Sequence, residues 1–154
     1  MTGNQFSVFT PLLTTLTQCG SLDTENGIYY LGNNVTWNGT CFNITANSVT
    51  LNCKGYEINY SATGTLGYGI WSNATNTTIR NCRIVEGSAT TNNKCAVYFY
   101  KASNGTIENN TINTTGSSGL GIRLESSSNS NTITSNTIST AGGYGHGVYL
   151  YSSS

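Results

Sequence analysis

Six carboxylic acids are the side chains of this sequence best suited to acid–base chemistry. They are Asp23, Glu25, Glu57, Glu86, Glu108 and Glu125. Hydrolysis of a glycosidic bond needs two carboxyl groups across a cleft, roughly 5–9 Å apart. The internal repeat of the chain places no two of the later acids side by side, and the first two lie among turn residues. The sequence therefore predicts no catalytic residue, and it leaves open whether the chain is part of an enzyme.

Metal and cofactor sites are not predicted either. His146 is the only histidine, and it lies between two glycines in a segment typical of a solvated turn. No spacing of histidine and cysteine matches a zinc site, and the sulfur ligands that copper prefers are missing. The glycine-rich segment 142–147 precedes no helix, so it is not expected to bind phosphate. We expect no metal and no cofactor.

Aromatic and charged side chains at equivalent repeat positions are the candidates for ligand binding. One outward row would contain Trp71, Tyr98, Arg123 and Tyr149, and a second, two residues further along, Asn73, Tyr100, Glu125 and Tyr151. Neighbouring rings can stack, and arginine can lie over tyrosine. Such a strip could stiffen the coil, bind flat sugar rings or contact another protein. The candidate carbohydrate-binding residues are Trp71, Tyr98, Tyr100, Arg123, Glu125, Tyr149 and Tyr151.

Cysteines and glycosylation motifs bear on the compartment. Five cysteines in a small, charge-poor domain favour an oxidising compartment, with buried thiols in a reducing cell as the alternative. Residues 1–5 lack the basic start and apolar core of a signal peptide, so Met1 is interpreted as the start of a fragment. We expect an extracellular or cell-surface glycoprotein. The candidate N-x-S/T acceptors are Asn34, Asn38, Asn43, Asn59, Asn73, Asn76, Asn104, Asn109 and Asn113.

The charge content argues against two classes of partner. Charged residues make up only 8% of the 154 residues, and the net charge is zero. A nucleic-acid binder needs a basic face to neutralise phosphates, so nucleic acid is not an expected partner. The sequence has no long apolar stretch and no basic amphipathic run, so membrane insertion is not expected.

An internal repeat indicates the elements that position these residues. Segments of the type Gly69-Ile70-Trp71-Ser72 start at residues 69, 96, 121 and 147, in steps of 27, 25 and 26 residues, with an earlier copy at Cys41. Each segment alternates inward and outward positions, as a strand does. Two further short strands follow in each repeat. Because a strand of two to five residues cannot bury its apolar side alone, the repeats must stack in parallel coils. The predicted fold is all-β, a right-handed parallel β-helix with three short strands per coil and four to five coils.

Stacking of the coils predicts three inward columns and one polar corner. Asn110 and Asn136 should stack at this corner, and their amides should bond to each other and to the turn backbone. The ion pairs Arg80–Glu108 and Arg123–Glu125 should form on the surface. A β-sandwich is the alternative fold, but it does not explain a motif that returns every 25–28 residues. The predicted columns are Phe42/Ile70/Val97/Ile122/Val148, Leu51/Ile79/Ile107/Ile133 and Ile58/Ile84/Ile112/Ile138.

The same register suggests a disulfide arrangement. Cys53 and Cys82 occupy the same corner one coil apart, which brings their Cα atoms within the range that a disulfide needs. Cys19 would then join Cys41 at the start of the first coil, and Cys95 would remain unpaired. Sequence alone does not fix connectivity.

Residues 121–131 and 131–138, which read GIRLESSSNSN and NTITSNTI, carry a family resemblance. They resemble the β-helix repeats of the pectin-lyase-like superfamily, above all its carbohydrate-binding and sugar-hydrolase subgroup. Residues 39–55 are similar to the opening coil of such domains in archaeal surface proteins. The resemblance covers residues 31–154 and implies the fold, but members of the superfamily range from polysaccharide lyases to structural spikes.

Outside the repeat, residues 1–30 are predicted to form an N-terminal cap, with Phe6, Val8, Phe9, Leu12 and Leu13 covering the first coil. Residues 31–154 are predicted to form the β-helix, truncated at its C-terminal end. Three functions remain open: a non-catalytic module or stalk that binds a glycan, part of a polysaccharide lyase or glycoside hydrolase, and a fibre subunit that stacks end to end. Because Tyr98 and Tyr149 should point away from the core, their removal is expected to leave the fold intact.

Overall fold

Three parallel sheets form the whole of the described structure. The computed structural model describes residues 12–88 and 92–151, which form strands and turns and no helix. Sheet A contains β1 (Leu13–Leu16), β3 (Ile28–Leu31), β6 (Thr50–Asn52), β9 (Thr78–Arg80), β12 (Thr106–Glu108) and β15 (Thr132–Thr134). Sheet B contains β2 (Gly20–Leu22), β5 (Phe42–Ile44), β8 (Tyr68–Ser72), β11 (Cys95–Tyr100), β14 (Leu120–Glu125) and β17 (Val148–Tyr151). Sheet C contains β4 (Val35–Thr36), β7 (Glu57–Tyr60), β10 (Arg83–Glu86), β13 (Thr111–Thr114) and β16 (Thr137–Thr140).

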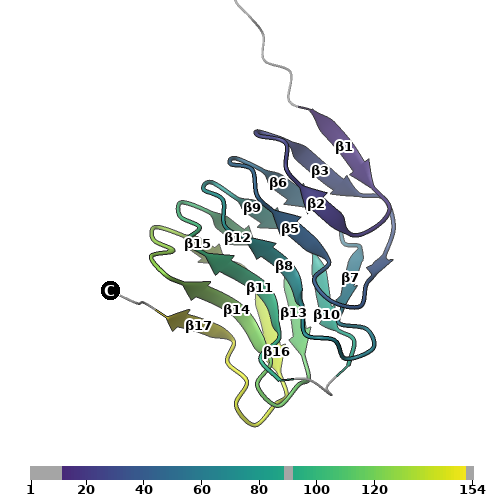
Figure 1. Cartoon of the computed structure of the whole chain (residues 1–154), viewed down its shortest axis with the longest axis vertical. Coiled ribbons are helices and arrows are strands. Elements are labelled where there is room, and N and C mark those ends of the chain that lie inside the picture. Colours follow the sequence, from purple (N-terminus) through teal and green to yellow (C-terminus); the bar gives the residue numbers. More distant parts are fainter. Residues whose placement is uncertain (1–11, 89–91, 152–154) are drawn as a thin grey trace, which may run out of the picture.

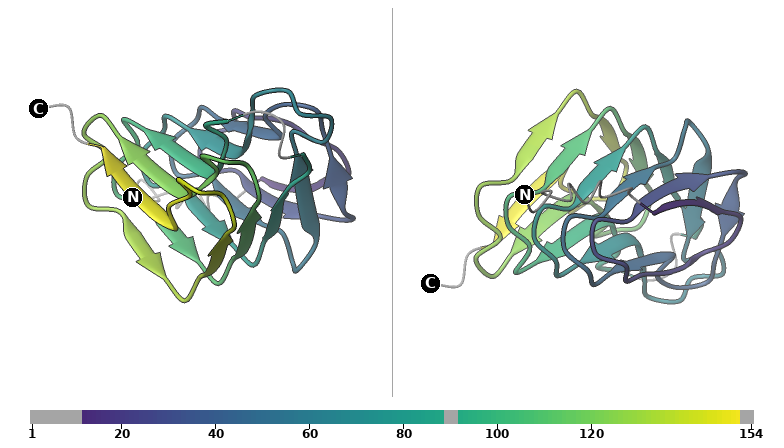
Figure 2. Two further views of the ribbon diagram at one scale, coloured as in Figure 1. Left: turned by 90° about the horizontal axis from the view of Figure 1, so that it is seen from below. Right: turned by 90° about the horizontal axis from the view of Figure 1, so that it is seen from above.

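From β3 onward the chain visits the sheets in the order A, C, B and then returns to sheet A one coil further along (Figure 1). About five turns result, and every strand pair is parallel. The views from below and from above show the coils stacked one after another from the purple to the yellow end (Figure 2). The predicted parallel β-helix is therefore confirmed.

The interior is made of the predicted columns of apolar side chains. In sheet A, Leu51, Ile79 and Ile107 are in register and fully buried, and Ile133 continues the column half-buried. The columns from Phe42 in sheet B and Ile58 in sheet C are in register as predicted. The alternation of buried and exposed residues along each short strand places these side chains inside.

Two glycines explain why a small residue opens the repeated segment. A Cβ on Gly69 would lie 2.5 Å from the carbonyl oxygen of Ala96, and one on Gly121 would lie 2.4 Å from that of Gly147. The backbones of neighbouring coils approach too closely here for a larger side chain. The small residue is therefore a packing requirement of the coil.

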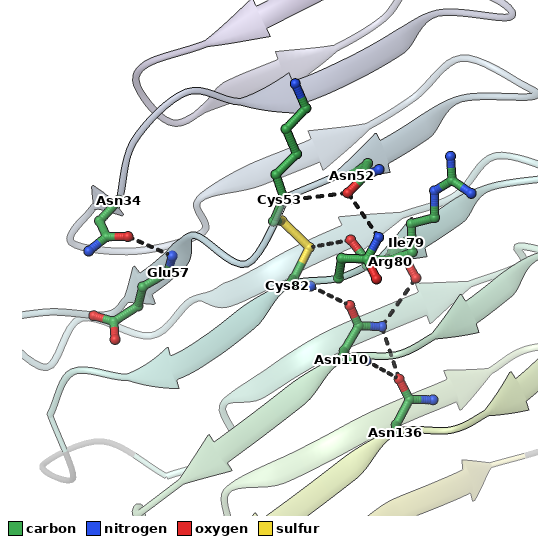
Figure 3. The surroundings of a disulfide bond; sticks show 11 residues. Asn34, Asn52, Cys53, Glu57, Ile79, Arg80, Cys82, Asn110 and Asn136 are labelled. Atoms are coloured by element: carbon green, nitrogen blue, oxygen red, sulfur yellow. Dashed lines mark hydrogen bonds between the residues drawn. A yellow bond between two sulfur atoms is a disulfide. The ribbon is translucent and has the colours of Figure 1, made fainter.

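The corner between sheets A and C changes from a disulfide to asparagines along the axis (Figure 3). Cys53 and Cys82 form a disulfide with their Cα atoms 4.7 Å apart. One coil further, the Asn110 Oδ1 atom accepts a hydrogen bond from the Cys82 N–H at 2.9 Å, and the Asn110 Nδ2 atom donates to the Asn136 Oδ1 atom at 3.0 Å. Both the predicted disulfide and the predicted asparagine stack are confirmed.

Pairing in sheets A and B extends further toward the N-terminus than the repeat indicated. Strands β1 and β2 lie inside the range 1–30 that was predicted as a cap, yet β1 pairs with β3 and β2 pairs with β5. Leu12 and Leu13, expected to cover the first coil, are 57% and 63% exposed. Phe6, Val8 and Phe9 lie outside the described residues. The predicted disulfide Cys19–Cys41 is present and joins this part of the chain to the next coil.

Candidate functional site

The outward side of sheet B, here called the outer face, holds the predicted aromatic row. Strands β8, β11 and β14 have five or six residues, longer than the strands of the other sheets, so they present more outward positions. Tyr98 is in register with Trp71 on one side and with Arg123 on the other, and Arg123 is in register with Tyr149. The row continues through Asn43 to Ser21. The structure thus brings the first predicted row together.

The second predicted row is shorter. Tyr100, Glu125 and Tyr151 are in register on β11, β14 and β17. Asn73, which was placed in the same row, follows the end of β8 and belongs to the next turn. The row therefore begins one coil later than predicted.

A third row was not anticipated from the sequence. Cys95 is in register with Tyr68 and Leu120 at the start of the outer-face strands. These residues directly precede the small residue that opens each repeated segment, and each is tyrosine, cysteine or leucine. The recurrence of a large or apolar residue at this position is the sequence signal that could have predicted the third row.

The three rows form a second apolar cluster, separate from the interior of the coil. Cys95, Tyr98 and Leu120 are its buried members, and Tyr68, Trp71, Tyr100 and Tyr149 pack against them. We call these seven residues the outer cluster. The ring centroids of Tyr68 and Tyr98 lie 5.0 Å apart in an edge-to-face arrangement. Such pairs contribute about 0.5–1.5 kcal/mol beyond their burial.

Tyr98 is only 9% exposed, so its ring is not an open platform for a ligand. As predicted, the Tyr98 ring points away from the interior column. It is nevertheless buried, because it packs within the outer cluster. Neighbouring coils supply the side chains that bury it. The accessible part of the aromatic row is therefore at its ends.

Charged and aromatic groups are locked together around Arg123. The Arg123 guanidinium lies 4.9 Å from the ring centroid of Tyr98 and 5.9 Å from that of Tyr149. It forms the predicted ion pair with Glu125, and the Tyr98 hydroxyl donates a hydrogen bond to the Glu125 carboxylate at 2.8 Å. Cation–π and charge-assisted contacts hold these groups in one arrangement.

Three groups of the outer cluster, the Cys95 thiol and the hydroxyls of Tyr68 and Tyr98, have raised pKa values. Burial raises the pKa of the Cys95 thiol to about 12. Burial and the hydrogen bond to Glu125 raise the pKa of Tyr98 above its ordinary value, and burial raises the pKa of Tyr68. A thiol attacks as its thiolate, so Cys95 is not an activated nucleophile. The outer cluster is thus suited to packing and binding.

A shallow hollow of about 270 Å³ opens at the end of the outer face near β17. Tyr144 is 76% exposed beside it, and the His146 ring lies 5.5 Å from that of Tyr149. Rings, an amide, a hydroxyl and a guanidinium therefore surround one open space. The residues lining this hollow are Asn93, Ser118, Leu120, Arg123, Tyr144, His146 and Tyr149.

Glu57, Glu86, Glu108 and Glu125 form ion pairs at separate places in the fold. Arg80 pairs with Glu108 at 3.9 Å as predicted, and Arg83 pairs with Glu57. Glu86 is buried and lies 3.3 Å from the buried Lys94 ammonium. The second oxygen of Glu86 accepts hydrogen bonds from the backbone N–H groups of Thr115 and Gly116, which ties the turn after β13 to β10. Within residues 12–88 and 92–151, no group of three His, Cys, Asp or Glu side chains could hold a metal ion.

The cysteines and asparagines bear on the compartment. Cys19–Cys41 and Cys53–Cys82 are disulfides, and Cys95 is the free cysteine, as the register indicated. Two disulfides are typical of a non-reducing setting. Seven of the nine predicted glycosylation acceptors are exposed, and Asn43 and Asn59 are half-buried. Glycosylation at any of them stays a prediction. No helix among the described residues could cross a membrane.

The family model of the right-handed β-helix region matches residues 21–154, most of the chain. The chain belongs to the right-handed β-helix family. No curated protein and no solved structure shows significant similarity to it. The family match agrees with the predicted pectin-lyase-like superfamily, whereas the likeness to archaeal surface proteins stays a prediction. Membership of a β-helix family defines the fold and does not define an activity.

Proposed function

We propose that this β-helix is a non-catalytic extracellular module that binds carbohydrate at the outer face. The observation that carries the proposal is the hollow beside Tyr149, where aromatic rings and polar groups converge. A sugar ring has apolar C–H faces and a rim of hydroxyl groups, so it needs both kinds of contact at once. Small-molecule sites of this type combine apolar surface with a few placed polar groups.

The accessible rings supply the apolar part of the binding site. Tyr144 is mostly exposed, and Tyr149 stacks on Tyr151 with ring centroids 6.3 Å apart. A sugar lying on Tyr149 could exchange hydrogen bonds with Asn93 and Ser118, which line the same hollow. Each stacked ring contributes on the order of 1 kcal/mol, so the expected affinity is millimolar to high micromolar.

An extracellular location is supported by independent features. Disulfides persist in oxidising compartments, and this chain has two in a small domain. Exposed N-x-S/T acceptors are compatible with passage through a glycosylating pathway.

Titration of a glycan panel against the disulfide-bonded protein tests the proposal. Tyr149→Ala and Tyr144→Ala should each weaken binding at least fivefold, because each removes a ring from the hollow. Tyr56→Ala is the matched control, since Tyr56 is 38% exposed and does not line the hollow. Circular dichroism should show the same fold for all variants. If no glycan binds at several millimolar, carbohydrate binding is overturned.

The outer cluster favours a second candidate function, that of a stiff surface stalk. Cys95, Tyr98 and Leu120 are buried outside the interior of the coil, so sheet B is packed on both sides. Packing on two sides resists bending of the stacked coils. Under this alternative, Tyr149→Ala lowers the melting temperature and no glycan binds.

A further inference from the structure

Among the residues that the structure describes, Arg123 is the only arginine or lysine that lines the hollow, and Glu125 already neutralises its charge. Glu125 forms an ion pair with it from the same strand, β14. We propose that Glu125 restricts the hollow to uncharged sugars and excludes uronic acids by holding Arg123 in this pair. The inference rests on the proposed function and names the ligand class of the same site.

The ion pair is partly removed from water, which makes it costly to break. The side chains of Arg123 and Glu125 are 24% and 16% exposed. A uronate that captured Arg123 would leave the Glu125 carboxylate without its cation, close to the incoming carboxylate. Truncating or removing one partner of a desolvated charge pair is unfavourable mainly because the other charge is left unpaired.

Further contacts keep both charged groups in place. The Tyr98 hydroxyl donates to the Glu125 carboxylate at 2.8 Å, and the rings of Tyr98 and Tyr149 flank the Arg123 guanidinium. Arg123 has five N–H donors, so the pair with Glu125 does not prevent it from donating to a sugar hydroxyl. A neutral sugar therefore gains a donor without disturbing the pair.

The other described arginine and lysine side chains are not placed to pair with a uronate at the hollow. Arg80, Arg83 and Lys94 are paired with Glu108, Glu57 and Glu86. Lys54 lies over the Tyr30 ring in sheet A. Lys101 lies over the Tyr100 ring, beyond the far end of β11 and roughly 20 Å from its start. Among the described arginine and lysine side chains, only Arg123 therefore reaches the hollow, and Glu125 compensates its charge.

The test uses hexamers of β-1,4-linked glucose and mannose, together with the same hexamers oxidised at C6 to uronates. Titrations are run at pH 7.5 and 150 mM NaCl, where distant charges are screened. Wild-type protein should bind a neutral hexamer at least fivefold more tightly than its uronate. Glu125→Gln keeps the size of the side chain and an acceptor for Tyr98, but it frees the charge of Arg123. This variant should lower the preference for the neutral hexamer about fivefold, equivalent to about 1 kcal/mol.

Glu108→Gln is the matched control, because it releases Arg80 in sheet A, away from the hollow. The Glu108→Gln variant should prefer the neutral hexamer over its uronate to the same extent as the wild type. Uronates that bind the wild type as tightly as the neutral hexamers would overturn the inference, as would an unchanged preference in Glu125→Gln. Either result leaves carbohydrate binding intact. If neither class binds, the proposed function itself is overturned.

Discussion

At the scale of single residues, Tyr98 connects most of the contacts of the outer face. Its ring packs edge-to-face on Tyr68, its face lies under Arg123, and its hydroxyl bonds to Glu125. One side chain therefore joins three coils through apolar, cationic and hydrogen-bonded contacts. The stability of the outer face should depend on this residue more than on any exposed ring.

Tyr98→Ala should therefore destabilise the fold, unlike the expectation from sequence. Removing a buried aromatic side chain costs about 3 kcal/mol of unfolding free energy, whereas Tyr98→Phe removes only the hydrogen bond to Glu125, at about 1 kcal/mol. Tyr144→Ala, at an exposed position, should change stability by less than about 0.5 kcal/mol. Urea unfolding of the three variants measures these values. A Tyr98→Ala protein as stable as the wild type would show that the outer cluster contributes little.

Cys95 should resist alkylation in the folded protein. Its thiol is fully buried, and burial raises its pKa to about 12 from an ordinary 9.0, so the thiolate fraction at pH 8.5 is about a thousandfold lower than in the unfolded chain. Iodoacetamide should therefore label Cys95 only after unfolding in urea, as mass spectrometry can measure. Equal labelling rates with and without urea would contradict the buried position.

At the scale of secondary-structure elements, the corner between sheets A and C determines how the coils stack. Four residues at this corner adopt positive φ angles of 50–54°, namely Lys54, Asn81, Asn109 and Ser135. The chain therefore turns in the same way in four successive coils. The Cys53–Cys82 disulfide and the side chains of Asn110 and Asn136 then link one coil to the next.

Asn110→Leu should show how much this corner contributes. Asn110 is buried, and the change would leave the Cys82 N–H without its acceptor and the Ile79 carbonyl without the Asn110 donor. Unsatisfied buried groups cost about 1–3 kcal/mol each, so a loss of about 3 kcal/mol is expected.

Asn136→Leu is the matched comparison at the next coil. Asn136 makes equivalent bonds to the Asn110 N–H and the Ile107 carbonyl, but it is half-buried, so water can replace part of them. Its loss of unfolding free energy should be about half as large. Equal losses in urea unfolding would indicate that burial does not set the cost.

At the scale of the whole molecule, stability should vary along the axis, because each coil contacts only its neighbours. The columns are fully buried at Ile79 and Ile107 but only half-buried at Ile133 and Ile138. On β17, Val148 is 44% and Leu150 is 69% exposed. The coil formed by β15, β16 and β17 therefore has the least burial to hold it closed.

Hydrogen exchange followed by mass spectrometry should reveal this gradient. Backbone amides of β9 to β13 should exchange at least tenfold more slowly than those of β15 to β17, because local opening costs less where fewer apolar side chains are buried. Peptides of β6 and β9 should also be protected by the disulfide between Cys53 and Cys82. Uniform exchange along the axis would indicate that the coils open as one unit.

The sequence by itself determined the coil and its columns, and it suggested a disulfide arrangement that the structure confirms. A motif that returns every 25–28 residues is compatible with only one parallel register of the stacked coils. That register sets which residues become neighbours. Ile79 therefore had to lie between Leu51 and Ile107, and Cys53 had to lie near Cys82 at a shared corner, where the structure joins them. These features follow from the period alone because each contact joins equivalent positions one coil apart.

Only the tertiary structure decided which side chains are accessible to solvent and ligands. β1 lies 15 residues before β3, a spacing that the repeat does not contain, so its place in sheet A could not be read from the period. The burial of Tyr98 arises from Cys95, Leu120 and Tyr68, which come from three different coils and fill space outside the repeat's own interior. Accessibility depends on how side chains of different length pack sideways as well as along a column. A one-dimensional period specifies the column but not this lateral packing, which involves Leu120 and Tyr149, two of the residues that line the hollow.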